Sequence, residues 1–98
     1  MAIVETSIVP IGTSTTSLSS YVAGCIKVLE ASGLSYQLHG MGTIIEGDLD
    51  RILDVILKMH EVPFDEGARR VITSIKIDDR RDRKGSATDK VRSVTERL

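Results

Sequence analysis

The stretch "LSYQLHGMGTIIEG", Leu34 to Gly47, decides the fold of this chain. Apolar and polar residues alternate before its two central glycines and again after them, and this period of two is typical of β-strands. Gly40, Met41 and Gly42 separate the two runs. The pattern predicts a β-hairpin, and we expect both glycines to supply the positive φ that tight connections require.

Helical periodicity flanks this hairpin on both sides. Before it, apolar residues recur at Leu18, Val22, Cys25, Ile26 and Leu29; after it, they recur at Leu49, Ile52, Leu53 and Ile56. Thr16 or Ser17 is available to cap the first helix and Asp48 the second, while Gly33 suits a left-handed helix end. We expect His60 near the end of the second helix, with Pro63 and Gly67 closing that segment.

Strands are predicted at both ends of this helix–hairpin–helix unit. "AIVETSIVP", residues 2–10, and "RRVITSIKI", residues 69–77, are rich in β-branched residues, and "TDKVRSVTERL", residues 88–98, predicts a short last helix. The order is therefore β-α-β-β-α-β plus a C-terminal helix, the split β-α-β pattern of an α+β protein. We predict one domain over residues 1–98, with a four-stranded antiparallel sheet and two helices on one of its faces.

Composition excludes several classes of function. The chain is 41% hydrophobic and 28% charged with a net charge of -1, so we expect a soluble, cytoplasmic protein that binds neither nucleic acid nor membranes. No stretch reaches the ~18 apolar residues of a membrane span. The charges of "DDRRDRK", Asp78 to Lys84, alternate in sign, which is typical of a solvated linker or rim.

The open face of the predicted sheet mixes isoleucines with polar groups. Alternation places there Ile3, Glu5, Ser7, Gln37, His39, Ile44, Glu46, Ile72, Ser74 and Lys76. The first and third strands are central neighbours in this topology, so Glu5 and Glu46 can converge. Such a face either packs in a homo-oligomer or holds a small ligand, for example a cationic heterocycle or an aminopyrimidine paired with the carboxylates.

This chain lacks the key residues of the enzymes and metal carriers that share its predicted topology. An acylphosphatase needs an arginine in the loop after the first strand and an asparagine elsewhere; residues 10–17 contain no arginine and the chain contains no asparagine. A metallochaperone needs a C-x-x-C pair, and Cys25 is the single cysteine. Cys25 lies in the apolar helix stripe, which predicts a core thiol. We expect no catalytic residues, no cofactor and no metal.

Several segments also resemble one known family. "VPIGT", "SGLSYQL", "MGTIIEGD", "ARRVITSIKIDDRRD" and "DKVRSV" are similar to recurring stretches of the thiamine-binding protein family, and the likeness covers nearly the whole chain. The resemblance implies a ferredoxin-like fold and assembly into dimers and tetramers through sheets and strand edges. It also implies binding of thiamine or its hydroxymethylpyrimidine moiety, without an established catalytic activity.

We therefore predict a non-catalytic, homo-oligomeric carrier or sensor for thiamine or a related pyrimidine. The alternative is a structural or regulatory homo-oligomer whose open face only packs against another subunit. Glu5 and Glu46 would hold the amino-pyrimidine or balance the positive charge of the ligand, and the ring would be oriented by Ser7, Gln37, Thr43 and Ser74. Thr43 is the weakest of these candidates because it alternates onto the other face of its strand.

Overall fold

The computed structural model describes residues 1–13, 18–82 and 85–98, and it confirms the predicted order of elements. The strands and helices in chain order are β1 (Ala2–Pro10), α1 (Ser19–Ser32), β2 (Ser35–His39), β3 (Gly42–Gly47), α2 (Leu49–Asp65), β4 (Val71–Asp79) and α3 (Ala87–Thr95). No helix in these described ranges is both long and apolar enough to cross a membrane.

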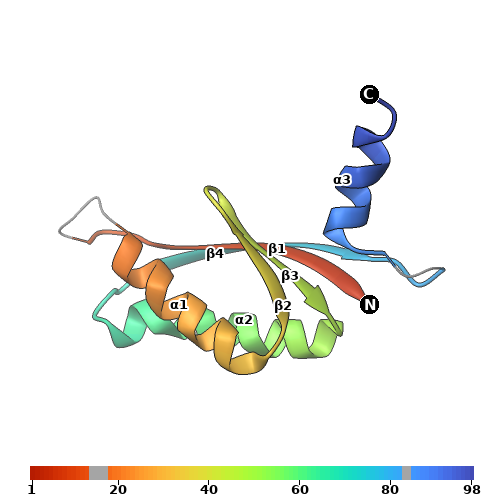
Figure 1. Ribbon diagram of the computed structural model, residues 1–98. Helices are drawn as coiled ribbons and strands as arrows, with labels where there is room; N and C mark the ends of the chain where they lie inside the picture. Colours follow the sequence, from red (N-terminus) through yellow and green to blue (C-terminus); the bar gives the residue numbers. More distant parts are fainter. Residues whose placement is uncertain (14–17, 83–84) are drawn as a thin grey trace.

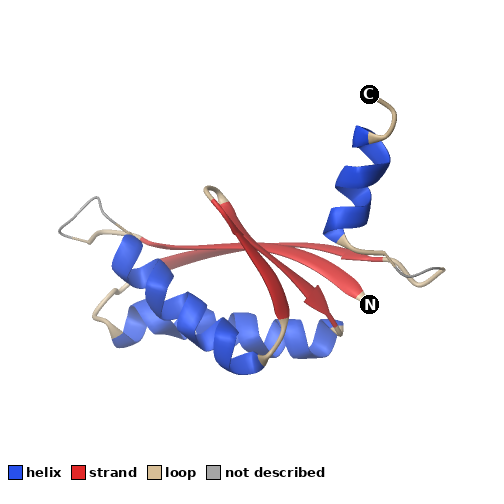
Figure 2. Cartoon of the chain, in the orientation of Figure 1, coloured by secondary structure: helices blue, strands red, loops and turns tan. Residues whose placement is uncertain are grey.

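The four strands form one antiparallel sheet in the order β2-β3-β1-β4. Helices α1 and α2 lie together on one face of this sheet, whereas α3 stands on the opposite side near the end of β4 (Figures 1 and 2). This is the ferredoxin-like arrangement with an added C-terminal helix. Most of the second face of the sheet is therefore not covered by the described residues.

The core lies between the sheet and α2. Val4 of β1, Ile45 of β3 and Ile52 of α2 are fully buried, and Leu29 of α1 joins them from the outer helix. Opposed residues of an antiparallel pair point to the same face, and Val4 is opposite both Ile45 and Ile77. The predicted division of the strands into a helix-facing side and an open side is therefore correct.

Cys25 has a structural role that depends on a proline in the neighbouring helix. Pro63 lies inside α2 and has no N–H, so the carbonyl of Met59, four residues earlier, loses its usual helical donor. The Cys25 thiol donates to that carbonyl across 3.4 Å. Burial, with a smaller contribution from the Glu66 carboxylate, raises the pKa of Cys25 to about 11, so the thiol keeps its proton. The predicted core thiol is thus also a hydrogen-bond donor.

Two predicted helix boundaries need correction. Helix α2 continues through Pro63, which therefore does not close it, and ends at Asp65, shortly before the predicted Gly67. His60 lies five residues before this end, and its Nδ1 is 2.6 Å from the Thr73 hydroxyl of β4. The N-cap position of α1 is Leu18, without a side-chain cap, and the predicted caps at residues 16 and 17 lie outside the described residues. Gly33 does end α1 in the left-handed conformation, with φ of 75°.

The hairpin is present, but the predicted reason for its glycines is wrong. Gly40 and Gly42 do not adopt positive φ; in this region Gly47 does, with φ of 148°. Gly42 is required by a close contact instead, because a Cβ there would lie 2.9 Å from the carbonyl oxygen of Thr6 on β1. A Cβ on Gly40 would meet nothing within 4 Å.

Candidate functional site: the open face of the sheet

The strand register arranges the open face in rows that cross the sheet. One row runs Gln37–Ile44–Glu5–Lys76 and the next runs Ser35–Glu46–Ile3–Asp78. Ser7 and Ser74 are directly opposite each other one row further along β1 and β4. Five of the six predicted site residues therefore share this face: Glu5, Ser7, Gln37, Glu46 and Ser74.

The two glutamates are diagonal neighbours on the two central strands. Glu5 is opposite Ile44, and Glu46 is opposite Ile3. Diagonal residues of an antiparallel pair lie about 7–8 Å apart, within reach of long side chains that converge on one ligand. Glu5 is exposed and Glu46 is half-buried. Glu5 also stands opposite Lys76 of β4, so one cation borders the pair of carboxylates.

Thr43 does not join the other five residues. It shares the helix-facing side of β3 with Ile45, is opposite Thr6 of β1, and is only 6% exposed. The reason is the strict period of two in a strand: Thr43 and Glu46 are three residues apart and cannot share a face. The structure thus separates this predicted site residue from the carboxylates.

Helix α3 contacts the open face through its first turn. Glu46 Oε1 accepts a hydrogen bond from the backbone N–H of Ala87, the first residue of α3, at 2.6 Å. A carboxylate at a helix N-terminus is stabilised by the helix dipole and by the unpaired amides there. The Gln37 amide also donates to the Thr88 hydroxyl at 3.4 Å. The start of α3 therefore covers the β2–β3 side of the face.

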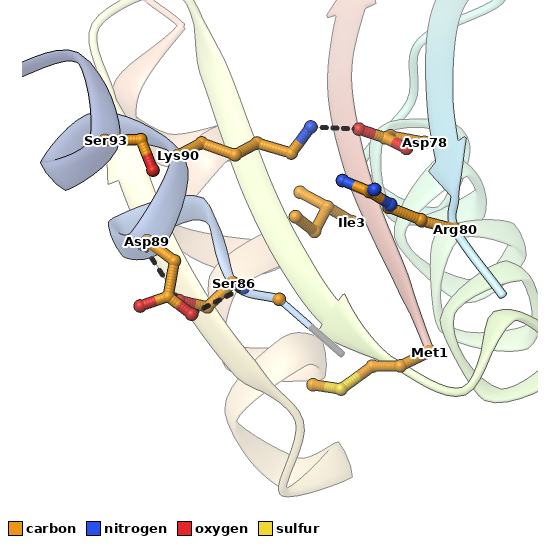
Figure 3. A pocket seen from close by; sticks show the side chains of 9 residues that line it. Met1, Ile3, Asp78, Arg80, Ser86, Asp89, Lys90 and Ser93 are labelled. Carbon is orange, nitrogen blue, oxygen red and sulfur yellow. Dashed lines mark hydrogen bonds and ion pairs between the residues drawn. The ribbon is translucent and has the colours of Figure 1, made fainter. Parts of the chain in front are cut away.

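A cavity of about 440 Å³ lies between α3 and the sheet, beside this contact. Figure 3 shows side chains from both elements pointing into it: Met1, Ile3, Asp78, Arg80, Ser86, Asp89, Lys90 and Ser93. Lys90 of α3 forms an ion pair with Asp78 of β4, and Ser86 and Asp89 form a reciprocal capping box at the helix start. We call this space the α3 cavity.

The residues of the α3 cavity were not among the predicted site residues. Asp78 continues the outward alternation of Ser74 and Lys76 along β4, so the period of two was a signal that could have identified it. In the neighbouring pairs Arg80–Asp82 and Arg81–Asp79, Asp79 is half-buried and the other three side chains are exposed, as predicted for a solvated rim. Asp82 raises the pKa of Arg80, and Arg81 lowers the pKa of Asp79.

A metal ion has no evident place on this face. Within the described part of the chain, no three histidine, cysteine, aspartate or glutamate side chains gather as a metal site requires. The groups that do gather are carboxylates, one amide and hydroxyls. These suit hydrogen bonds and ionic contacts with an organic molecule.

The fold and this face together define a class: a small ferredoxin-like α+β protein whose second sheet face carries both polar and apolar side chains. The family model described as "Thiamine-binding protein" matches residues 4–95, and the chain belongs to that family. The family resemblance predicted from the sequence is thereby confirmed.

Relatives and solved structures agree with this assignment. The chain is 49% identical to the UPF0045 protein YqgV of Bacillus subtilis, over 100% of this chain and 98% of that protein. It is 42% identical to a UPF0045 protein of Methanothermobacter thermautotrophicus, over the full length of both. The crystal structure of MJ1052 from Methanocaldococcus jannaschii superposes with a TM-score of 0.88 at 35% identity, covering 97% of this chain and 96% of that one.

Proposed function

We propose that this protein binds thiamine or a related pyrimidine on the open sheet face, as a homo-oligomeric carrier or sensor that catalyses no reaction. The family to which the chain belongs is named for thiamine binding. The observation that carries the proposal is the placement of Glu5 and Glu46 on one face of adjacent central strands.

The chemistry of these two carboxylates fits such a ligand. Thiamine has a permanently cationic thiazolium ring and an amino group on its pyrimidine ring. One carboxylate balances the charge, while the other accepts a charge-assisted hydrogen bond from the amino group. Glu46 uses Oε1 for Ala87, and Oε2 has no hydrogen-bond partner among the described residues, so this oxygen is available to a ligand. Ser7, Gln37 and Ser74 surround the pair with groups that orient a ring.

A second candidate function, a structural or regulatory homo-oligomer, is favoured by exposed apolar side chains. Val91 and Val94 of α3 are 65% and 61% exposed, and Ile72 and Ile75 of β4 are 48% and 45% exposed. β4 is also an edge strand, with no partner along its outer side among the described residues. Apolar surface of this kind is typical of protein interfaces. Both candidate functions are homo-oligomers, so a measurement of ligand binding, and not of oligomeric state, distinguishes them.

Isothermal titration with thiamine tests the proposal at protein concentrations near ~0.1 mM. We expect saturable heat for the wild-type protein and affinity at least about tenfold weaker for Glu46→Gln and for Glu5→Gln, because each loses a charged acceptor. Glutamine keeps a carbonyl oxygen at residue 46, so the contact with Ala87 survives. Glu61→Gln, on the exposed side of α2, is the matched control and leaves the affinity unchanged.

Two results would count against the proposal. The absence of binding heat for the wild-type protein would favour the structural oligomer. Equal affinities of the wild-type, Glu5→Gln and Glu46→Gln proteins for thiamine would show that the binding site does not lie on the open face. The non-catalytic part is tested separately: thiamine recovered after long incubation should be chemically unchanged by liquid chromatography.

A further inference from the structure

A second cavity lies on the other side of the sheet, between the β2–β3 hairpin and the first turns of α1. Its volume is about 260 Å³, and we call it the hairpin pocket. It exists because α1 packs chiefly against α2 and touches the sheet little. The tip of the β2–β3 hairpin curves away from the helix layer (Figure 1).

The walls of the hairpin pocket are apolar. Leu18, Val22 and Ile26 line it from the α1 side, and Leu38 and Ile8 line it from β2 and β1. No aspartate, glutamate, lysine or arginine among the described residues lines it, and His39 is the single ionisable ring at its rim. A charged ligand would lose its hydration there without gaining a partner, so the pocket favours neutral molecules.

One buried polar side chain that lines the pocket has no hydrogen-bond partner among the described residues. The Thr43 side chain lines the pocket, is 6% exposed, and makes no hydrogen bond with any described residue. Two other polar groups of the pocket do have partners: the Thr6 hydroxyl donates to the carbonyl of Ser74 at 2.9 Å, and the Cys25 thiol donates to that of Met59. Ser7 and His39 also line the pocket, but they are half-buried and exposed, so Thr43 differs from them in being buried. No buried side-chain oxygen or nitrogen in the described residues is sealed without a partner, so the Thr43 hydroxyl opens onto the cavity. A valine would fill the same space without a hydroxyl to satisfy.

The size of the pocket limits the ligand to one or two rings. A cavity of about 150 Å³ holds benzene, and pockets for drug-sized ligands begin near ~300 Å³. The hairpin pocket, at about 260 Å³, falls between these two. We propose that it is a binding site, separate from the open face, for a neutral aromatic or heteroaromatic molecule of one or two rings that hydrogen-bonds to the Thr43 hydroxyl.

Indole is a suitable probe, because it is neutral, flat and carries one N–H donor. We expect indole to shift the amide resonances of Thr43, Cys25 and Leu38 in ¹⁵N-labelled protein, saturating near ~1 mM. Thr43→Val keeps the shape but removes the hydroxyl, and it should weaken binding by about threefold to tenfold. Thr95→Val, on the exposed side of α3, is its control and leaves the affinity unchanged.

A second variant tests the cavity itself. Val22→Phe places a ring in the pocket from the half-exposed side of α1 and should abolish the indole shifts, while Leu57→Phe, on the exposed side of α2, leaves them intact. Saturating thiamine, a cation, should not displace indole. The proposal is overturned if indole gives no saturable shifts, if Val22→Phe binds like the wild type, or if thiamine competes. These readouts do not depend on whether thiamine binds the open face.

Discussion

The two faces of the sheet differ in composition although both are formed by the same four strands, whose successive residues point to opposite faces. On β3, Ile45 faces the helices and is fully buried, whereas Ile44 and Glu46 face outward and are only partly covered. The centre of the helix-facing side is apolar and buried. The open side combines isoleucines with carboxylates, amides and hydroxyls. The buried residues of a strand thus stabilise the fold, and we propose that their outward-facing neighbours bind the ligand.

The sharpest test of this division compares two adjacent isoleucines. Ile45→Ala removes a fully buried side chain and should lower the free energy of unfolding by about 2–5 kcal/mol. Ile44→Ala, on the open face of the same strand, should lower it by less than about 1 kcal/mol. Urea denaturation of both variants measures the difference. Equal losses would mean that the open face is also part of the core.

A second comparison concerns the glycines of the hairpin. Gly42→Ala forces a Cβ to within 2.9 Å of the Thr6 carbonyl oxygen, so we expect a loss of about 1–3 kcal/mol. Gly40→Ala meets no neighbour and its φ is not positive, so its effect should stay within about 0.5 kcal/mol. Thermal or urea unfolding checks both. A harmful Gly40→Ala with a harmless Gly42→Ala would contradict the close contact between β1 and β3.

The buried thiol should make stability depend on alkaline pH. The pKa of Cys25 rises from 9.0 to about 11 in the folded protein, so its contribution is fully present below pH 9 and is lost as pH rises to about 11. The loss should be about 2–3 kcal/mol. Cys25→Ala removes the titrating group, and its stability should decline less over the same range. Parallel decline of the two proteins would show that the thiol does not contribute.

The smallest change in the free energy of unfolding is expected for a substitution at the edge of the α3 cavity. Lys90 and Asp78 form an ion pair between two exposed side chains, so Lys90→Ala should change stability by less than about 1 kcal/mol, and less at high salt. Val91→Ala, on the same helix, is a control for altered helix propensity. A large loss for Lys90→Ala would show that α3 is held on the sheet mainly by this pair.

The strand and helix periodicities together predicted the order of elements, and alternation along the strands predicted both faces of the sheet. It placed Val4 and Ile45 on the helix-facing side and Glu5 and Glu46 on the open face, because alternate side chains of a half-buried strand face the core and the solvent. The position of α3 was not predictable, since Val91 and Val94 form an apolar stripe that stays exposed. The contact between Gly42 and the Thr6 carbonyl could not be predicted from the sequence either, because it depends on how closely β1 and β3 approach each other and not on local sequence. The same applies to the bond between Cys25 and Met59, which joins two helices.

The central claim is that the open face, and not the helix-facing side, is the surface that binds a cationic pyrimidine ligand. Titration of ¹⁵N-labelled protein with thiamine, followed by amide chemical shifts, tests this claim most directly. We predict saturable shifts at Glu5, Gln37, Glu46 and Ser74, absent in the Glu5→Gln, Glu46→Gln double variant. Shifts confined to Thr43, Cys25 and Leu38 around the hairpin pocket, or none at all, would contradict it.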